Sequence, residues 1–117
     1  MTPNEYQVLA LRTANSSTLD VERIITPQQL KVINAVFGAY GEMAEISEPF
    51  KKWLFQGHEF PSLENARKEI GDVFWYLALL ATSLDLELED IMITNIEKLR
   101  KRFPEKFDTN LSINREE

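Results

Sequence analysis

The chain has 117 residues, a length that predicts one domain spanning residues 1–117. It has no cysteine and one histidine, His58, which excludes disulfides, zinc fingers, a thiol nucleophile and a multi-histidine metal site. Acidic residues outnumber basic ones by 19 to 13, and the net charge of −6 makes non-specific nucleic-acid binding unfavourable. Neither a signal peptide nor the ~20 apolar residues of a membrane span are evident, so a cytoplasmic location is expected.

Two helix starts stand out in the first part of the chain. Thr2 and Thr26 each precede a proline and lie three residues before a glutamate or glutamine, which is the pattern of a capping box. They predict one helix over about 3–13 and a second over about 27–56, with a glycine directly after the second. Residues 14–25 lack periodicity and are expected to form a loop, so that 1–25 form an N-terminal helix and loop.

Two more helices are predicted before the C-terminal tail. Ser62 caps a third helix that extends to about Leu84, and a fourth runs from about Leu86 to Phe103, where Pro104 ends it. Their apolar residues recur at three- and four-residue steps. Residues 26–103 therefore hold the core helices, and 104–117 are expected to form an extended tail. The predicted fold is all-α, with four helices.

The second and third helices are apolar on more than one side. The main stripe of the second helix comprises Leu30, Ile33, Phe37, Tyr40, Ala44 and Phe50. Further apolar residues lie outside the main stripes, namely Val32, Val36, Met43, Ile46, Trp75, Tyr76 and Leu79. Helices of this kind must be buried on several sides, which one short chain does not provide. We therefore expect a four-helix bundle that shares its core in a homodimer or homotetramer.

The same two helices carry paired carboxylates. Glu42 and Glu45 are three residues apart and share a helix face, and Glu69 and Asp72 repeat this spacing on the third helix. If the helices are antiparallel, the four carboxylates can converge, and a hard divalent cation would relieve their repulsion. Oxygen ligands favour Mg²⁺, with Mn²⁺ as a substitute. A di-iron centre needs Glu-x-x-His on two helices and is excluded by the single histidine.

The order of these motifs resembles the MazG-like members of the all-α nucleoside triphosphate pyrophosphohydrolases. Glu42-x-x-Glu45 is followed, after 23 residues, by Glu69-x-x-Asp72. The likeness covers about two-thirds of the chain and includes further segments, namely Lys51-Lys52, 69–77, 95–99, 102–104 and 112–115. The resemblance implies hydrolysis of a nucleoside triphosphate between the α and β phosphates, which releases a monophosphate and pyrophosphate.

The resemblance also suggests roles for individual residues. It implies that Glu42, Glu45, Glu69 and Asp72 hold Mg²⁺, and either Glu42 or Glu45 is the candidate base for the attacking water. The candidate phosphate ligands are Lys51, Lys52, Asn95, Lys98, Arg102 and Arg115. Asn95, Lys98 and Arg102 share one helix face by their spacing. Trp53, beside the lysine pair, is the candidate wall for the base.

Two other functions are compatible with the sequence. A non-catalytic helical oligomerisation or regulatory module would keep the fold, although retention of all four acids argues against it. Phosphoribosyl-ATP pyrophosphohydrolase cleaves the same bond in another substrate, but the pattern from Asn95 to Arg115 favours the MazG-like reading. The preferred base and sugar, and the choice between dimer and tetramer, remain open.

Overall fold

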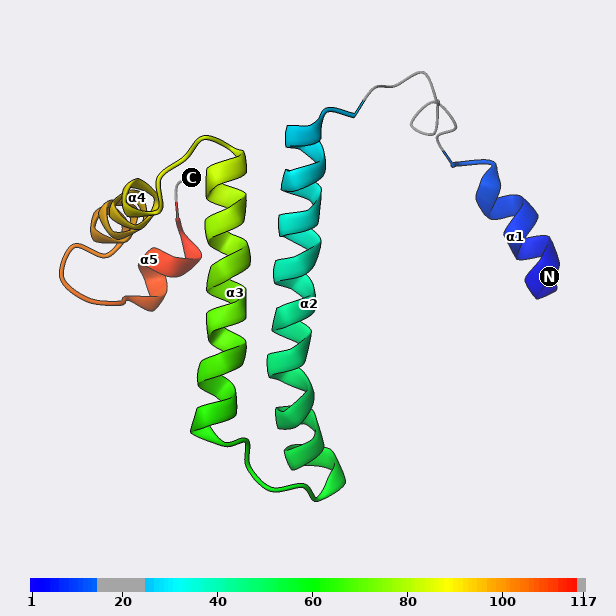
Figure 1. Cartoon of the computed structure of the whole chain (residues 1–117), viewed down its shortest axis with the longest axis horizontal. Coiled ribbons are helices and arrows are strands. Elements are labelled where there is room, and N and C mark those ends of the chain that lie inside the picture. The colour runs from blue at the N-terminus through cyan, green and yellow to red at the C-terminus, as the bar shows by residue number, and fades with distance from the viewer. Residues whose placement is uncertain (15–24, 116–117) are drawn as a thin grey trace.

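The computed structural model describes residues 1–14 and 25–115, and within these ranges every regular element is a helix (Figure 1). The all-α prediction is therefore confirmed. None of the described helices combines the length and apolar character needed to cross a membrane. The five helices are α1 (Pro3–Leu11), α2 (Pro27–Gln56), α3 (Leu63–Ser83), α4 (Leu88–Arg102) and α5 (Thr109–Ile113).

Local capping interactions begin the first three helices. The Thr2 hydroxyl accepts a hydrogen bond from the Glu5 amide at 3.2 Å, and the Thr26 hydroxyl accepts one from the Gln29 amide at 3.1 Å. The Ser62 hydroxyl does the same for α3. Gly57 ends α2 with φ of 71°, a left-handed conformation that glycine adopts without steric cost. These boundaries agree with the sequence because caps depend on residues close together in the chain.

The C-terminal segment differs from the prediction. Residues 104–117 were expected to be extended, but α5 forms within them because the Asp108 carboxylate caps it and accepts from the Leu111 amide at 3.0 Å. The structure thus has five described helices where four were predicted. Two ends also shift, since α1 stops at Leu11 and α4 starts at Leu88. The loop expected over 14–25 lies almost wholly outside the described residues.

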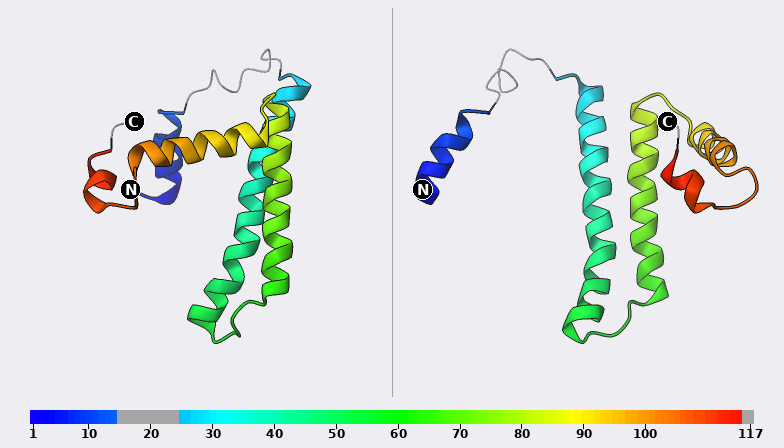
Figure 2. Two further views of the ribbon diagram at one scale, coloured as in Figure 1. Left: turned by 90° about the vertical axis from the view of Figure 1, so that its left-hand side faces the viewer. Right: turned by 180° about the vertical axis from the view of Figure 1, so that it is seen from behind.

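The two longest helices, α2 and α3, form an antiparallel hairpin, which we call the α2–α3 pair (Figure 1). α4 starts where α3 ends and runs away from the pair at a steep angle, as Figure 2 shows from two sides. α5 turns back toward α3, and α1 lies apart from the pair. The α2–α3 pair is therefore the frame that positions the predicted site.

Buried and half-buried residues mark the seam between α2 and α3. They recur at three- and four-residue steps, with Val32, Ala35, Ala39, Glu42 and Ile46 on α2 and Ala66, Glu69, Val73, Tyr76 and Leu80 on α3. Among the described residues only Ala35, Ala81 and Ser83 are fully buried. Two seam positions that would ordinarily be apolar hold Glu42 and Glu69. The hairpin thus places carboxylates inside its own interface.

The main apolar stripe of α2 does not face α3. Its residues are open to solvent in the single chain, and Phe37 and Tyr40 are 72% and 81% exposed. The seam uses the second apolar set instead, of which Val32 and Ile46 are members. The α2–α3 pair therefore leaves the most strongly apolar side of α2 uncovered.

Gly38 allows the two helices to approach closely beside the carboxylates. The ring of Tyr76 occupies the space in which a Cβ atom of residue 38 would lie. Gly38 is one turn before Glu42, and Tyr76 is one turn after Asp72. The lack of a side chain at Gly38 thus permits the close approach of the two helices beside the acids.

We expect Gly38→Ala to destabilise the protein and Gly41→Ala to stabilise it. Replacing a helical glycine by alanine gains up to ~1 kcal/mol, but overpacking against Tyr76 costs typically ~1–3 kcal/mol. Gly41 is the matched control, because nothing lies within 4 Å of an added Cβ there. Chemical denaturation should therefore give a lower free energy of unfolding for Gly38→Ala only. Equal stabilisation by both changes would contradict the close contact.

Candidate functional site

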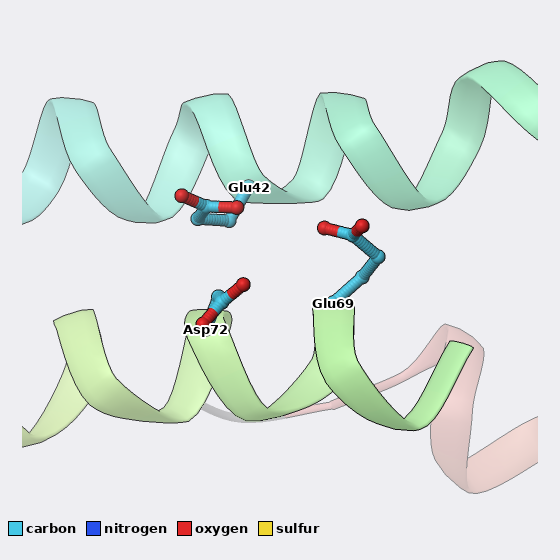
Figure 3. Close-up of side chains that lie close together, drawn as sticks. All are labelled: Glu42, Glu69 and Asp72. Carbon is cyan, nitrogen blue, oxygen red and sulfur yellow. The ribbon is translucent and has the colours of Figure 1, made fainter. Parts of the chain in front are cut away.

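Three carboxylates from different parts of the chain meet in the middle of the α2–α3 pair. Glu42 extends from α2, and Glu69 and Asp72 extend from α3 toward it (Figure 3). One oxygen from each carboxylate lies within 4.8 Å of those of the other two. We call these three residues the carboxylate cluster. Glu42 and Glu69 are half-buried, whereas Asp72 is exposed and opens the cluster to solvent.

The carboxylate cluster follows from helix geometry. Glu69 and Asp72 share a face of α3 because they are three residues apart. Glu42 and Glu69 both fall in the register of the seam, so the antiparallel hairpin brings them together across 27 positions of sequence. The convergence predicted from the spacing is thus present for three of the four acids.

The salt bridges formed by Met1, Lys51 and Lys68 supply no counter-ion to the negative charge of the carboxylate cluster. Partial burial raises the pKa of Glu42, and the charges of Asp72, Glu69 and Glu45 raise it further. The salt bridges within the described residues join Met1 to Glu5, Lys51 to Glu48, and Lys68 to Glu64. None of them reaches the cluster. Converging hard oxygen ligands with uncompensated charge fit a divalent cation such as Mg²⁺ or Mn²⁺.

Glu45 occupies a different position from the other three acids. It is exposed and lies outside the group of mutually close carboxylates. It is still near enough for its charge to raise the pKa of Glu42. Its predicted roles as a metal ligand or as a catalytic base remain predictions.

The predicted binding residues at the end of α2 lie away from the carboxylate cluster. Lys51 pairs with Glu48 at 3.1 Å, one turn back on the same helix. Trp53 makes an edge-to-face contact with Phe60, with ring centroids 5.0 Å apart. Trp53 and Glu42 share a face of α2, but eleven residues separate them by ~16 Å along the axis. Lys52, between them, is half-buried.

The predicted phosphate ligands farther along the chain lie on the C-terminal helices. Asn95, Lys98 and Arg102 are on α4, and Arg115 follows α5. Within the described chain no salt bridge connects Lys98 or Arg102 to the carboxylate cluster. The structure therefore brings together three of the four predicted metal ligands, without an ion pair from Lys98 or Arg102 to them.

One interaction near the pair was not predicted from sequence. The Gln28 amide nitrogen donates a 2.7 Å hydrogen bond to the carbonyl of Ser83, joining the start of α2 to the end of α3. Its partners are 55 residues apart, and no local pattern signals such a contact. It fixes the end of the α2–α3 pair that lies opposite the connecting loop.

Comparison with known proteins agrees with this geometry. Residues 35–107 match the sequence model of the MazG nucleotide pyrophosphohydrolase domain. The Gene 37 protein of Mycobacterium phage L5 is 38% identical over 68 residues, which cover 56% of this chain and 60% of the phage protein. No solved structure matches. Since the matched domain includes the whole carboxylate cluster and more than half of the sequence, the chain belongs to the MazG nucleotide pyrophosphohydrolase family.

Proposed function

We propose that the protein hydrolyses a nucleoside triphosphate between its α and β phosphates in the presence of Mg²⁺. The observation that carries this proposal is the convergence of Glu42, Glu69 and Asp72 in the α2–α3 seam. A divalent ion bound there would neutralise the triphosphate and the charge that develops on the departing pyrophosphate. The three carboxylates would hold this ion, with Mn²⁺ as a possible substitute.

The attacking water needs a base that is not occupied by the metal. Sequence reasoning left Glu42 and Glu45 as candidates, and the position of Glu42 within the carboxylate cluster favours Glu45. Glu45 is one turn from Glu42, exposed, and outside the cluster. Its carboxylate is suited to orient the water and accept its proton.

The amide of Asn95 and several basic side chains are proposed to hold the phosphate oxygens. Asn95, Lys98 and Arg102 share one face of α4, and their side chains together offer several donors. Lys52 and Arg115 are further candidates, whereas Lys51 already pairs with Glu48. Two alternatives to this function are phosphoribosyl-ATP as the substrate and a non-catalytic role for the helices. A panel of substrates distinguishes them from the proposed hydrolysis of a nucleoside triphosphate.

The first test is product analysis with a panel of nucleoside triphosphates and phosphoribosyl-ATP. We expect Mg²⁺-dependent release of pyrophosphate and a monophosphate, and no turnover in excess chelator. Asp72→Asn should reduce turnover by roughly two orders of magnitude, because it removes a charged metal ligand, while circular dichroism shows an intact fold. Release of orthophosphate, or full activity with chelator, would contradict the proposal. Cleavage of phosphoribosyl-ATP alone would favour the related enzyme.

The raised pKa of Glu42 gives a second test, based on stability. Between the ordinary pKa of a glutamate and the raised pKa of Glu42, the folded protein retains a proton that the unfolded chain has lost. Protonated Glu42 therefore favours folding at low pH. That contribution is lost as the pH rises through the raised pKa. In chelator, Glu42→Gln should therefore raise the melting temperature relative to the wild type above this pKa and leave it unchanged well below.

Mg²⁺ should reverse the order of the melting temperatures of the wild type and Glu42→Gln. Mg²⁺ should raise the melting temperature of the wild type above the Glu42 pKa and that of Glu42→Gln much less, because one charged ligand is missing. Glu59→Gln, in the exposed loop after α2, is the control and should respond to Mg²⁺ as the wild type does. If Mg²⁺ stabilised all three proteins equally, the ion would bind elsewhere.

We further propose that the protein is a homo-oligomer in which a second copy covers the exposed stripe of α2. The chain has an accessible surface of 10677 Å², whereas a folded monomer of its mass exposes about 6,600 Å². The difference of about 4,000 Å² per chain exceeds the roughly 1,000–2,500 Å² that each partner of an obligate dimer commonly buries. A self-complementary contact between copies is the commonest way to cover such a face.

Sedimentation should show a dimer or a tetramer. Phe37→Glu places a charge in the exposed stripe and should shift the protein toward monomer, with lower stability, because the interface must then bury an unpaired carboxylate. Lys101→Glu, at the exposed end of α4, is the control and should not change the assembly. A wild-type protein that stays monomeric at every concentration would rule the assembly out.

A further inference from the structure

A pocket lies at the end of the α2–α3 pair where α2 begins and α3 ends. This end of the helix pair is at the top of Figure 1. The pocket's volume of about 620 Å³ is within the range of small-molecule sites. We call it the open-end pocket, and its main lining residues are Gln28, Lys31, Asn34, Leu79, Thr82 and Asp85.

The open-end pocket and the carboxylate cluster are on the same side of the pair. Lys31 precedes Glu42 by eleven residues, within about 20° of three full helical turns. Leu79 follows Asp72 by seven residues, within about 20° of two full turns. The pocket therefore lies ~10–16 Å from the cluster along the helix axes. A sugar and base extending from a triphosphate at the cluster span a distance of this order.

Aromatic side chains lie between the carboxylate cluster and the open-end pocket. Trp75 is one turn after Asp72 in the direction of the pocket, and it is 60% exposed. Its ring meets that of Tyr76 edge to face, with centroids 4.9 Å apart, and Tyr76 packs on Gly38. Trp75 thus offers a flat apolar surface next to the path from the cluster to the pocket.

The polar groups of the pocket favour a nucleoside over a phosphate. Among the described residues, the side chains of Lys31, Asn34 and Asp85 form no hydrogen bond or salt bridge. Lys31 supplies donors, Asn34 both a donor and an acceptor, and Asp85 acceptors only. Base edges and sugar hydroxyls need this mixture, whereas a phosphate would be repelled by Asp85. Gln28 fixes the helix ends through its bond to Ser83.

We propose that the open-end pocket binds the nucleoside part of the triphosphate, with Asn34 and Thr82 contacting the base or sugar. The inference rests on the proposed function and adds the direction in which the substrate lies. The competing direction leads to Trp53 at the loop end of the pair. The ring of Trp53 already packs against Phe60 there, so the open-end pocket is the better partner for a nucleoside.

Two asparagines at similar distances from the carboxylate cluster provide a matched test. Asn34 is eight residues before Glu42, toward the pocket, and Asn65 is seven residues before Asp72, toward the Trp53 end. Calorimetry in Mg²⁺ should compare α,β-methylene nucleoside triphosphates of the common bases with inorganic triphosphate. Asn34→Ala and Thr82→Val should weaken binding of the best nucleotide by about three- to tenfold, as expected for a lost hydrogen bond. Inorganic triphosphate should bind all variants equally, and Asn65→Ala should change neither ligand.

Three results would overturn the assignment. Equal weakening of both ligands by Asn34→Ala would make the pocket a phosphate site. Weakening of the nucleotide by Asn65→Ala alone would place the nucleoside at the Trp53 end. An unchanged nucleotide affinity in all variants would exclude both positions for the nucleoside, the open-end pocket and the Trp53 end. Failure of the proposed function would appear separately, as a wild-type protein that binds the analogue but releases no pyrophosphate from any triphosphate.

Discussion

Mutual repulsion of carboxylates inside a helix–helix seam is the constraint on which the rest of this structure depends. Glu42 and Glu69 occupy positions where α2 and α3 would ordinarily bury apolar side chains. Each carboxylate loses hydration there, and their like charges oppose one another. The raised pKa of Glu42 reflects both effects. The fold therefore holds an unfavourable charge distribution, which the proposed divalent cation would relieve.

The structure keeps the acids together by close packing beside them. Ala35 is fully buried in the seam, and Gly38 admits the ring of Tyr76 one turn from Glu42. Small residues allow this approach, but they bury little apolar surface, and the two glutamates bury less still. The α2–α3 pair on its own is thus poorly stabilised for its size. Its low apolar burial also means that many large apolar side chains remain exposed in the single chain.

Sequence reasoning succeeded where the determining interactions are local. Helix starts at Thr2, Thr26 and Ser62 depend on contacts three residues away, and each was predicted. The pairing of Glu69 with Asp72 followed from helical spacing alone. The side of α2 that meets α3 could not be predicted, because two apolar stripes compete and the choice depends on the partner helix. Asp108 was overlooked as a cap because α5 is only five residues long.

The division of α2 into distinct faces would let the proposed assembly and the proposed substrate binding use different sides of the helix. Phe37, in the exposed stripe, lies five residues before Glu42, about 140° around the helix. A second copy packed on that stripe would therefore contact the side of α2 that faces away from α3. The carboxylate cluster and the open-end pocket lie along the seam and would stay open to solvent. Assembly could then supply the missing apolar burial without covering the site, and the seam could retain its unfavourable carboxylates.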